Sequence, residues 1–168
     1  MALISRLYSQ FIDLLRILSG VVVFIIFVLI VSDVLLRLTG LPLWTYSSGV
    51  VEYSLLWFTM LGAPWLARIK GHVFIDAVTQ LLPAGPQKII AKIVYTICIV
   101  SCLIFAWFSF QLLLDAFTSG QTDTRGEDFP LWALLFPIPF SFALVAIEFC
   151  RFLFGFDDMY AAADKEGV

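Results

Sequence analysis

Four long, nearly uncharged apolar runs leave this chain few ways to fold. They span residues 17–36, 49–67, 89–114 and 131–153. About 20 apolar residues in helical form cross the roughly 30 Å hydrocarbon core of a bilayer. Backbone polar groups find no water inside that core, so each run must satisfy its own hydrogen bonds as a helix. The sequence therefore predicts four transmembrane helices.

The composition supports lipid as the solvent for most of the chain. Of its 168 residues, 61% are hydrophobic and 14% are charged, whereas soluble domains have about half and about a quarter. The formal net charge is −3, and nucleic-acid binding needs a concentrated basic face instead. We therefore expect an all-α integral membrane protein, organised as a single membrane domain over residues 1–168, with no nucleic-acid partner.

Two further segments have the apolar and polar faces of an amphipathic helix. Residues 3–15 place Leu7 and Phe11 on one face and Asp13 on the other. Residues 72–82 repeat this pattern between the second and third spans. Helices of this kind lie flat in the membrane interface. The sequence therefore predicts one interfacial helix before the first span and another in the connection after the second.

Basic residues predict the orientation. Only Arg37 and Arg125 lie in the first and third connections. The other eight lie in the N-terminal segment, around the second connection and on the C-terminal side: Arg6, Arg16, Arg68, Lys70, Lys88, Lys92, Arg151 and Lys165. Lys and Arg concentrate on the cytoplasmic side of membrane proteins. Both termini and the second connection are therefore expected in the cytoplasm, with residues 115–130 as a short polar loop on the opposite side.

The charged residues inside the spans lie near the span ends. Asp33 and Arg37 are spaced i,i+4, and Glu148 and Arg151 are spaced i,i+3, so each couple can form an ion pair on one helix. A transporter that works alone usually places charges or broken helices near the bilayer centre. The pattern favours interfacial ion pairs in a supporting subunit.

Motifs for catalysis and cofactor binding are missing from the sequence. It has a single histidine, His72, so haem held between two histidines of this chain is excluded. We find no phosphate-binding loop, no hydrolase nucleophile motif and no metal-ligand spacing. Cys98, Cys102 and Cys150 lie in apolar runs and are expected to be packing residues. We predict no enzyme, no cofactor and no metal site.

The most distinctive segment runs from the second span into the connection that follows it. It contains Glu52, Trp57, Leu61, Gly62, Arg68, His72 and Asp76. Two interpretations of Arg68 and His72 stay open: anchors on lipid headgroups, or a polar cluster with Asp76 that fixes this connection against another protein. Glu52 either caps its own helix or pairs with Arg37 or with a partner. Trp57 is interpreted as a packing residue.

This segment resembles the small membrane subunit of TRAP transporters, the tripartite ATP-independent periplasmic carriers. The matching pattern is Glu52, Trp57, Leu61-Gly62, and then Arg68, His72 and Asp76 at four-residue spacing. The length and the four-span layout match as well. Pro64 and Trp65 depart from the small residues that the family often has at these positions.

The resemblance implies a small scaffold subunit of a sodium-driven importer of an organic acid in the bacterial inner membrane. Its partners would be a large membrane subunit and a periplasmic substrate-binding protein. The resemblance also implies that Glu52, Trp57, Gly62, Arg68, His72 and Asp76 form a partner interface or a structural polar cluster. Two other classes stay open: a stand-alone four-helix exporter with Glu52 as its proton site, and a haem-free membrane anchor of an oxidoreductase.

Overall fold

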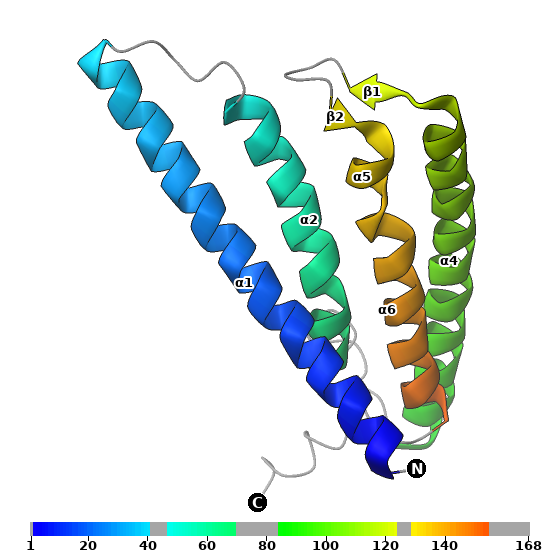
Figure 1. Cartoon of the computed structure of the whole chain (residues 1–168). Coiled ribbons are helices and arrows are strands. Elements are labelled where there is room, and N and C mark those ends of the chain that lie inside the picture. The colour runs from blue at the N-terminus through cyan, green and yellow to red at the C-terminus, as the bar shows by residue number, and fades with distance from the viewer. Residues whose placement is uncertain (1, 41–46, 70–83, 124–128, 155–168) are drawn as a thin grey trace, which may run out of the picture.

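The computed structural model describes residues 2–40, 47–69, 84–123 and 129–154. Its elements are α1 (Ala2–Thr39), α2 (Ser47–Arg68), α4 (Ala84–Ser119), β1 (Thr122–Asp123), β2 (Phe129–Pro130), α5 (Leu131–Leu135) and α6 (Pro137–Leu153) (Figure 1). Four helical stretches are long and apolar enough to cross a membrane. The prediction of four membrane-spanning segments is confirmed.

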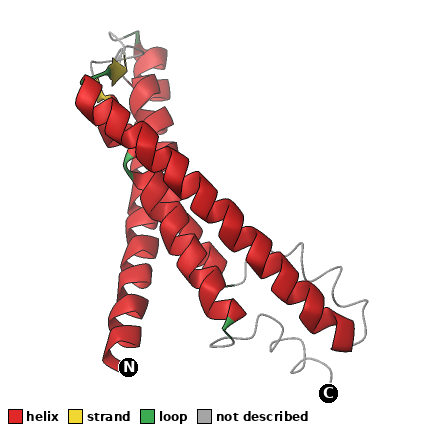
Figure 2. Ribbon diagram, turned by 90° about the vertical axis from the view of Figure 1, so that its right-hand side faces the viewer, coloured by secondary structure: helices red, strands yellow, loops and turns green. Residues whose placement is uncertain are grey.

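The helices form an open row instead of a closed bundle. α2 packs against α1 on one side and α6 on the other, and α6 packs against α4, so the order along the row is α1, α2, α6, α4 (Figure 1). The row is twisted, and its outer helices α1 and α4 cross when the molecule is turned by 90° (Figure 2). Such a row has two broad faces, and most of its large apolar side chains are exposed on them.

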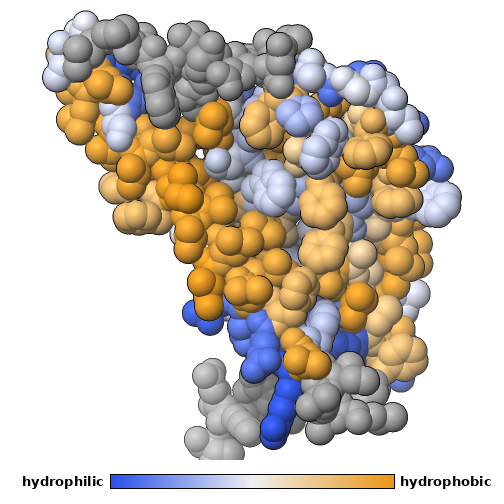
Figure 3. Space-filling model, viewed as in Figure 1, coloured by the Kyte–Doolittle hydropathy of each residue, from blue (hydrophilic) through white to orange (hydrophobic). Residues whose placement is uncertain are grey.

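Two buried clusters hold the row together. The first joins α2, α4 and α6 through Ala67, Tyr95, Val145, Phe149 and Phe152. The second joins α1, α2 and α6 through Ile12, Leu15, Leu61 and Leu144. Both lie toward the end of the molecule that carries Arg16, Arg68 and Arg151, which we call the basic end. The opposite end, with Arg37, Glu52 and the β1–β2 ribbon, is the far end. Figure 3 shows apolar side chains over the middle of one face and hydrophilic ones gathered at the basic end.

α1 and α2 approach each other closely where Ser19 meets Gly62. A Cβ atom built on Gly62 would lie 3.2 Å from the Ser19 Oγ. The Ser19 hydroxyl donates a hydrogen bond to the Phe58 carbonyl, at 3.5 Å. Small residues at such crossings let helix backbones pack tightly in lipid, where the hydrophobic effect does not drive helices together. Beyond the crossing α1 diverges from α2 (Figure 1), and Phe27 and Leu38 are 63% and 79% exposed.

The fourth span is broken into α5 and α6 at Phe136. Pro137 and Pro139 have no amide hydrogen, so the carbonyls of Ala133 and Leu135 cannot receive their usual bonds within the helix. The chain turns at Phe136, whose own amide still donates to the Trp132 carbonyl at 3.0 Å. The predicted span 131–153 therefore consists of a short helix followed by a longer one.

One predicted segment differs from the structure, and another is not covered by the described residues. The interfacial helix expected over residues 3–15 is not a separate element, because α1 runs unbroken from Ala2 to Thr39. Ile12 and Leu15, on its apolar face, are buried against α2 and α6, so packing uses the face expected to contact lipid. The interfacial helix predicted over residues 72–82 lies outside the described residues.

The described parts of the loop expected over residues 115–130, residues 115–123 and 129–130, include regular structure. α4 continues to Ser119, and the hydroxyls of Thr118 and Ser119 bond to the Asp115 carbonyl at 3.2 and 2.6 Å. Gly120, with φ of 62°, then ends the helix, since glycine adopts this left-handed conformation without strain. The chain next forms the antiparallel β1–β2 ribbon, in which Thr122 pairs with Pro130 and Asp123 with Phe129.

Candidate functional site

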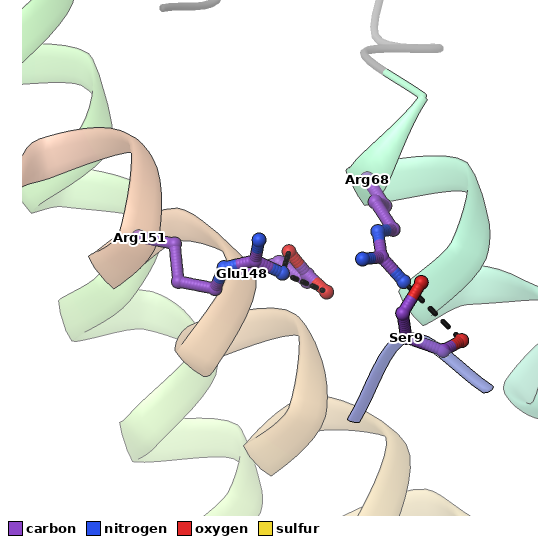
Figure 4. A network of polar contacts seen from close by, with 4 residues as sticks. All are labelled: Ser9, Arg68, Glu148 and Arg151. Carbon is purple, nitrogen blue, oxygen red and sulfur yellow. Dashed lines mark hydrogen bonds and ion pairs between the residues drawn. The ribbon is translucent and has the colours of Figure 1, made fainter. Parts of the chain in front are cut away.

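A polar cluster at the basic end joins α1, α2 and α6. At its centre, the Glu148 side chain is only 1% exposed. The Arg151 Nη1 donates to both carboxylate oxygens, at 3.1 Å to Oε2 and 3.3 Å to Oε1. Both side chains extend from α6 toward the side where α1 and α2 lie (Figure 4). The carboxylate is therefore buried, and its counter-ion Arg151 is half-buried.

Tyr8 of α1 covers this ion pair. The Arg151 guanidinium lies 5.5 Å from the centre of the Tyr8 ring, which is within the range of a cation–π contact. The Tyr8 hydroxyl is buried, and the Glu148 carboxylate lies within reach as its acceptor. Arg151 and Arg68 are close enough for their charges to act on this hydroxyl. Tyr8 thus links the first turns of α1 to α6.

Arginines also tie the end of α2 to α1. The Arg68 Nη1 donates to the Ser9 carbonyl over 3.5 Å (Figure 4). This bond is long, because N–H···O bonds usually measure 2.7–3.2 Å. Two turns further along α1, the Arg16 guanidinium lies 4.7 Å from the centre of the Trp65 ring. The contacts of Arg68 and Arg16 hold α1 against the last turns of α2.

Among the described residues, the charged side chains near Tyr8 are Arg68, Arg151 and Glu148. Each guanidinium offers five N–H donors. Such an arrangement can clamp three helices together. It offers no nucleophile with an adjacent base. Among the described residues no group of three or more His, Cys, Asp and Glu could hold a metal ion.

The predicted site residues separate into different parts of the molecule. Arg68 belongs to the basic-end cluster, whereas His72 and Asp76 lie outside the described residues. Trp57 packs against the buried cluster around Leu61, and Gly62 forms the crossing with α1. These two residues have packing roles within the chain.

Glu52 lies at the far end, in the second turn of α2, and is exposed. It lines an open groove of about 680 Å³ between α2, β1 and α5, together with Thr59 and Leu131. At this groove the Tyr53 hydroxyl donates to Asp123 Oδ2 at 2.9 Å. The Glu52 carboxylate is therefore at the opposite end of α2 from Arg68.

Both predicted ion pairs are present in the structure, but one is more exposed than the other. Arg37 Nε lies 2.9 Å from Asp33 Oδ2, and the Arg37 side chain is 60% exposed. Glu148 and Arg151 were expected to pair near the membrane interface, yet Glu148 is fully buried among three helices. Its burial follows the spacing of Ser141, Leu144, Glu148 and Phe152, which share one face of α6 and are all buried.

Five residues with contacts described above were not predicted from the sequence as site residues: Tyr8, Ser9, Ser19, Tyr53 and Asp123. Each of them matters through a contact with a distant part of the chain, such as that of Tyr53 with Asp123. One signal was available for Tyr8. It lies one helical turn before Ile12 and two before Leu15, so a helix brings it to the face on which those residues pack.

Comparisons with known proteins point to one family. The family model described as "Tripartite ATP-independent periplasmic transporters, DctQ component" matches residues 26–156. A curated relative, the C4-dicarboxylate TRAP transporter small permease protein DctQ of Pseudomonas aeruginosa, is 23% identical over 111 residues. That alignment covers 65% of this chain and 53% of the relative, so the chain matches about half of the relative's length. No solved structure is significantly similar. The family match covers all four spans at least in part, and the chain belongs to the DctQ family of small membrane components of tripartite ATP-independent periplasmic transporters.

Proposed function

We propose that this chain is the small scaffold subunit of a sodium-driven, binding-protein-dependent importer of an organic acid. The name of the Pseudomonas aeruginosa relative includes C4-dicarboxylate, which makes dicarboxylic acids the first candidates for the substrate. The large membrane subunit would carry substrate and sodium. This chain would pack against that subunit and support it.

The open row of helices is the observation that carries the proposal. A row encloses no pathway of its own, and residues 17–32, 53–67, 93–114 and 131–147 of the described helices contain no Asp, Glu, Lys or Arg. None of the most apolar part of α4 is buried within the chain, and α1 beyond Ile26 is largely exposed. These surfaces are available to another membrane protein and to lipid. A stand-alone exporter would instead need polar groups along an enclosed path.

The excess of Lys and Arg at the basic end supports a cytoplasmic location for that end. We infer that both termini are cytoplasmic and that the chain lies in the bacterial inner membrane. The far end, with Glu52 and the β1–β2 ribbon, then faces the periplasm. A periplasmic substrate-binding protein would approach from that side.

The test is purification of the tagged chain from its native membrane in a mild detergent. A large multi-span membrane protein should come with it, and membranes lacking this chain should lose sodium-dependent uptake of dicarboxylates. The isolated chain, reconstituted in liposomes under a sodium gradient, should take up nothing. Uptake by the isolated chain would contradict a scaffold role and favour a transporter that acts alone.

A further inference from the structure

An open groove of about 440 Å³ lies between α4 and the broken fourth span. Its lining from α4 includes Ala106, Trp107 and Phe110, and its lining from the fourth span includes Pro139 and Phe140. These residues belong to the uncharged runs 93–114 and 131–147, so the groove lies at the depth of the hydrocarbon core. It is an apolar surface that the described helices leave open.

One polar group at this groove is a donor, the indole N–H of Trp107. The Trp107 side chain is 62% exposed and has no hydrogen-bond acceptor among the described residues. Tryptophan in membrane proteins is enriched at the headgroup level, where water and lipid headgroups accept its hydrogen bond. Trp107 lies eight residues before Asp115, the nearest charged residue of α4, which is about 12 Å of helix. At that depth acyl chains offer its N–H group no acceptor.

A second polar group beside the groove is an acceptor, the Leu135 carbonyl. Pro139 has no amide hydrogen to donate to it, and the described residues supply no other donor. Pro139 lines the groove, and Leu135 lies one turn before it on the same side of the span. Backbone groups freed by proline in membrane helices are normally satisfied by neighbouring helices or ordered water. The described part of the chain thus leaves one donor and one acceptor unused at this place.

The partial charges of these two groups indicate what fills the groove. An acyl chain can neither donate to the carbonyl nor accept from the indole, whereas hydroxyl and amide side chains do both between membrane helices. The small side chains of Ala106 and Ala143, which line the groove, let a helix backbone approach closely. We propose that a transmembrane helix of the large subunit packs in this groove, with Ser, Thr, Asn or Gln side chains that bond to the Leu135 carbonyl and the Trp107 indole. The inference rests on the proposed function, which supplies the large subunit as the partner.

The first test uses the complex of the full chain with the large multi-span protein that co-purifies with it. The photoreactive analogue benzoylphenylalanine takes the place of Phe140, which lines the groove and is exposed. Irradiation of the membranes should link it to an apolar segment of the large subunit that contains Ser, Thr, Asn or Gln, identified by peptide mass spectrometry. Links to phospholipid acyl chains alone would overturn the proposal and make lipid the occupant.

Substitutions at the groove measure its contribution to the affinity between the two subunits. Ala143→Phe fills the groove and should weaken association about tenfold or more. Ala143 is exposed, so the added ring does not crowd the chain's own core, and Ala143→Gly is the control that leaves the groove open. Trp107→Phe keeps an aromatic ring but removes the N–H group, and it should weaken association about threefold. Trp132→Phe is its matched control, because Trp132 does not line the groove and lies near the far end of its span, where water can accept its bond.

Energy transfer between fluorescently labelled subunits in mixed micelles measures these dissociation constants. If the large subunit co-purified with the chain but bound Ala143→Phe and Trp107→Phe as tightly as the wild type, this inference would be wrong and the proposed function would stand. If no large subunit co-purified with the wild-type chain, the proposed function would fail, and this inference with it.

Discussion

At the scale of single residues, Glu148 stands out because it is the charged residue that is buried among those that the structure describes. Its carboxylate is 1% exposed and is compensated mainly by Arg151, 3.1 Å away. Transfer of an ion from water into a protein interior is unfavourable by several kcal/mol unless a well-placed counter-ion offsets it. The pair therefore matters less for the attraction it provides than for the penalty that follows when one member is lost.

Arg151→Ala should lower the free energy of unfolding by about 3 kcal/mol, because it leaves the buried Glu148 carboxylate without its counter-ion. The double variant Glu148→Leu with Arg151→Met should recover most of this loss, since two apolar side chains need no counter-ion. Denaturant titration in mixed micelles measures the free energy of unfolding of the single and the double variant. Asp33→Asn, in the more exposed pair with Arg37, is the control and should cost below about 1 kcal/mol. If breaking the Glu148–Arg151 pair and breaking the Asp33–Arg37 pair lowered the free energy of unfolding equally, burial would not explain the importance of Glu148.

Gly62 and Ser19 allow a second test at the residue scale. Gly62→Ala brings a methyl group to 3.2 Å from the Ser19 Oγ, and overpacking of this kind costs about 1–3 kcal/mol. Adding Ser19→Ala removes the crowding oxygen, so the double variant should be more stable than Gly62→Ala alone. Gly20→Ala is the control, because nothing lies within 4 Å of a Cβ at that position. If the stability changes of Gly62→Ala and Ser19→Ala, measured by thermal unfolding, simply added in the double variant, a direct contact at this crossing would be excluded.

At the scale of elements, the sequence predicted the spans well and their ends less well. Long apolar runs fix the number of helices, because lipid accepts no other regular structure that one segment can form. Composition cannot tell a flat interfacial helix from the first turns of a long one. In the structure Ile12 and Leu15 pack on α2 and α6. Residues 3–15 are therefore the first turns of the long helix α1. Likewise, Glu148 lies on an apolar helix whose faces look alike in sequence, so only the fold shows which face is buried.

The break between α5 and α6 should control the far end of the molecule. Replacing Pro137 and Pro139 together by Ala restores two amide donors and should straighten the fourth span. α5 would then move relative to α2, and the bond between Tyr53 and Asp123 should weaken. A double-mutant cycle with Tyr53→Phe and Asp123→Asn measures this bond, and its coupling should fall toward zero in the straightened chain. Unchanged coupling would show that the prolines do not position the ribbon.

At the scale of the whole molecule, the orientation rests on the separation of charge between the two ends. A reporter that is active only in the periplasm should be active when fused after Asp123, since that residue lies at the far end. It should be inactive when fused after Gly85 or Val168. The reverse pattern would contradict the positive-inside argument and place the basic end outside the cytoplasm.

The positions of Glu52 and Arg68 on α2 have a consequence for the bilayer around the molecule. Between them lie 15 uncharged residues, 53–67, or about 22 Å of helix. On α4, the 22 uncharged residues 93–114 span about 33 Å, close to the hydrocarbon thickness of roughly 30 Å. The uncharged stretch of α2 is thus shorter than that of α4, although both helices lie in the same membrane. We expect lipid beside α2 to be compressed, at a fraction of a kcal/mol per Å of mismatch.

This compression should make stability depend on acyl-chain length. In phosphatidylcholine bilayers with chains of about 14 to 22 carbons, the melting temperature should be highest with the shorter lipids. Glu52→Leu lengthens the uncharged stretch of α2 and should shift that optimum toward longer chains, whereas Glu52→Asp should leave it in place. If both variants shared one optimum, the bilayer would not be responding to the height of α2. If the two optima differ, this chain sets the local thickness of the membrane around it.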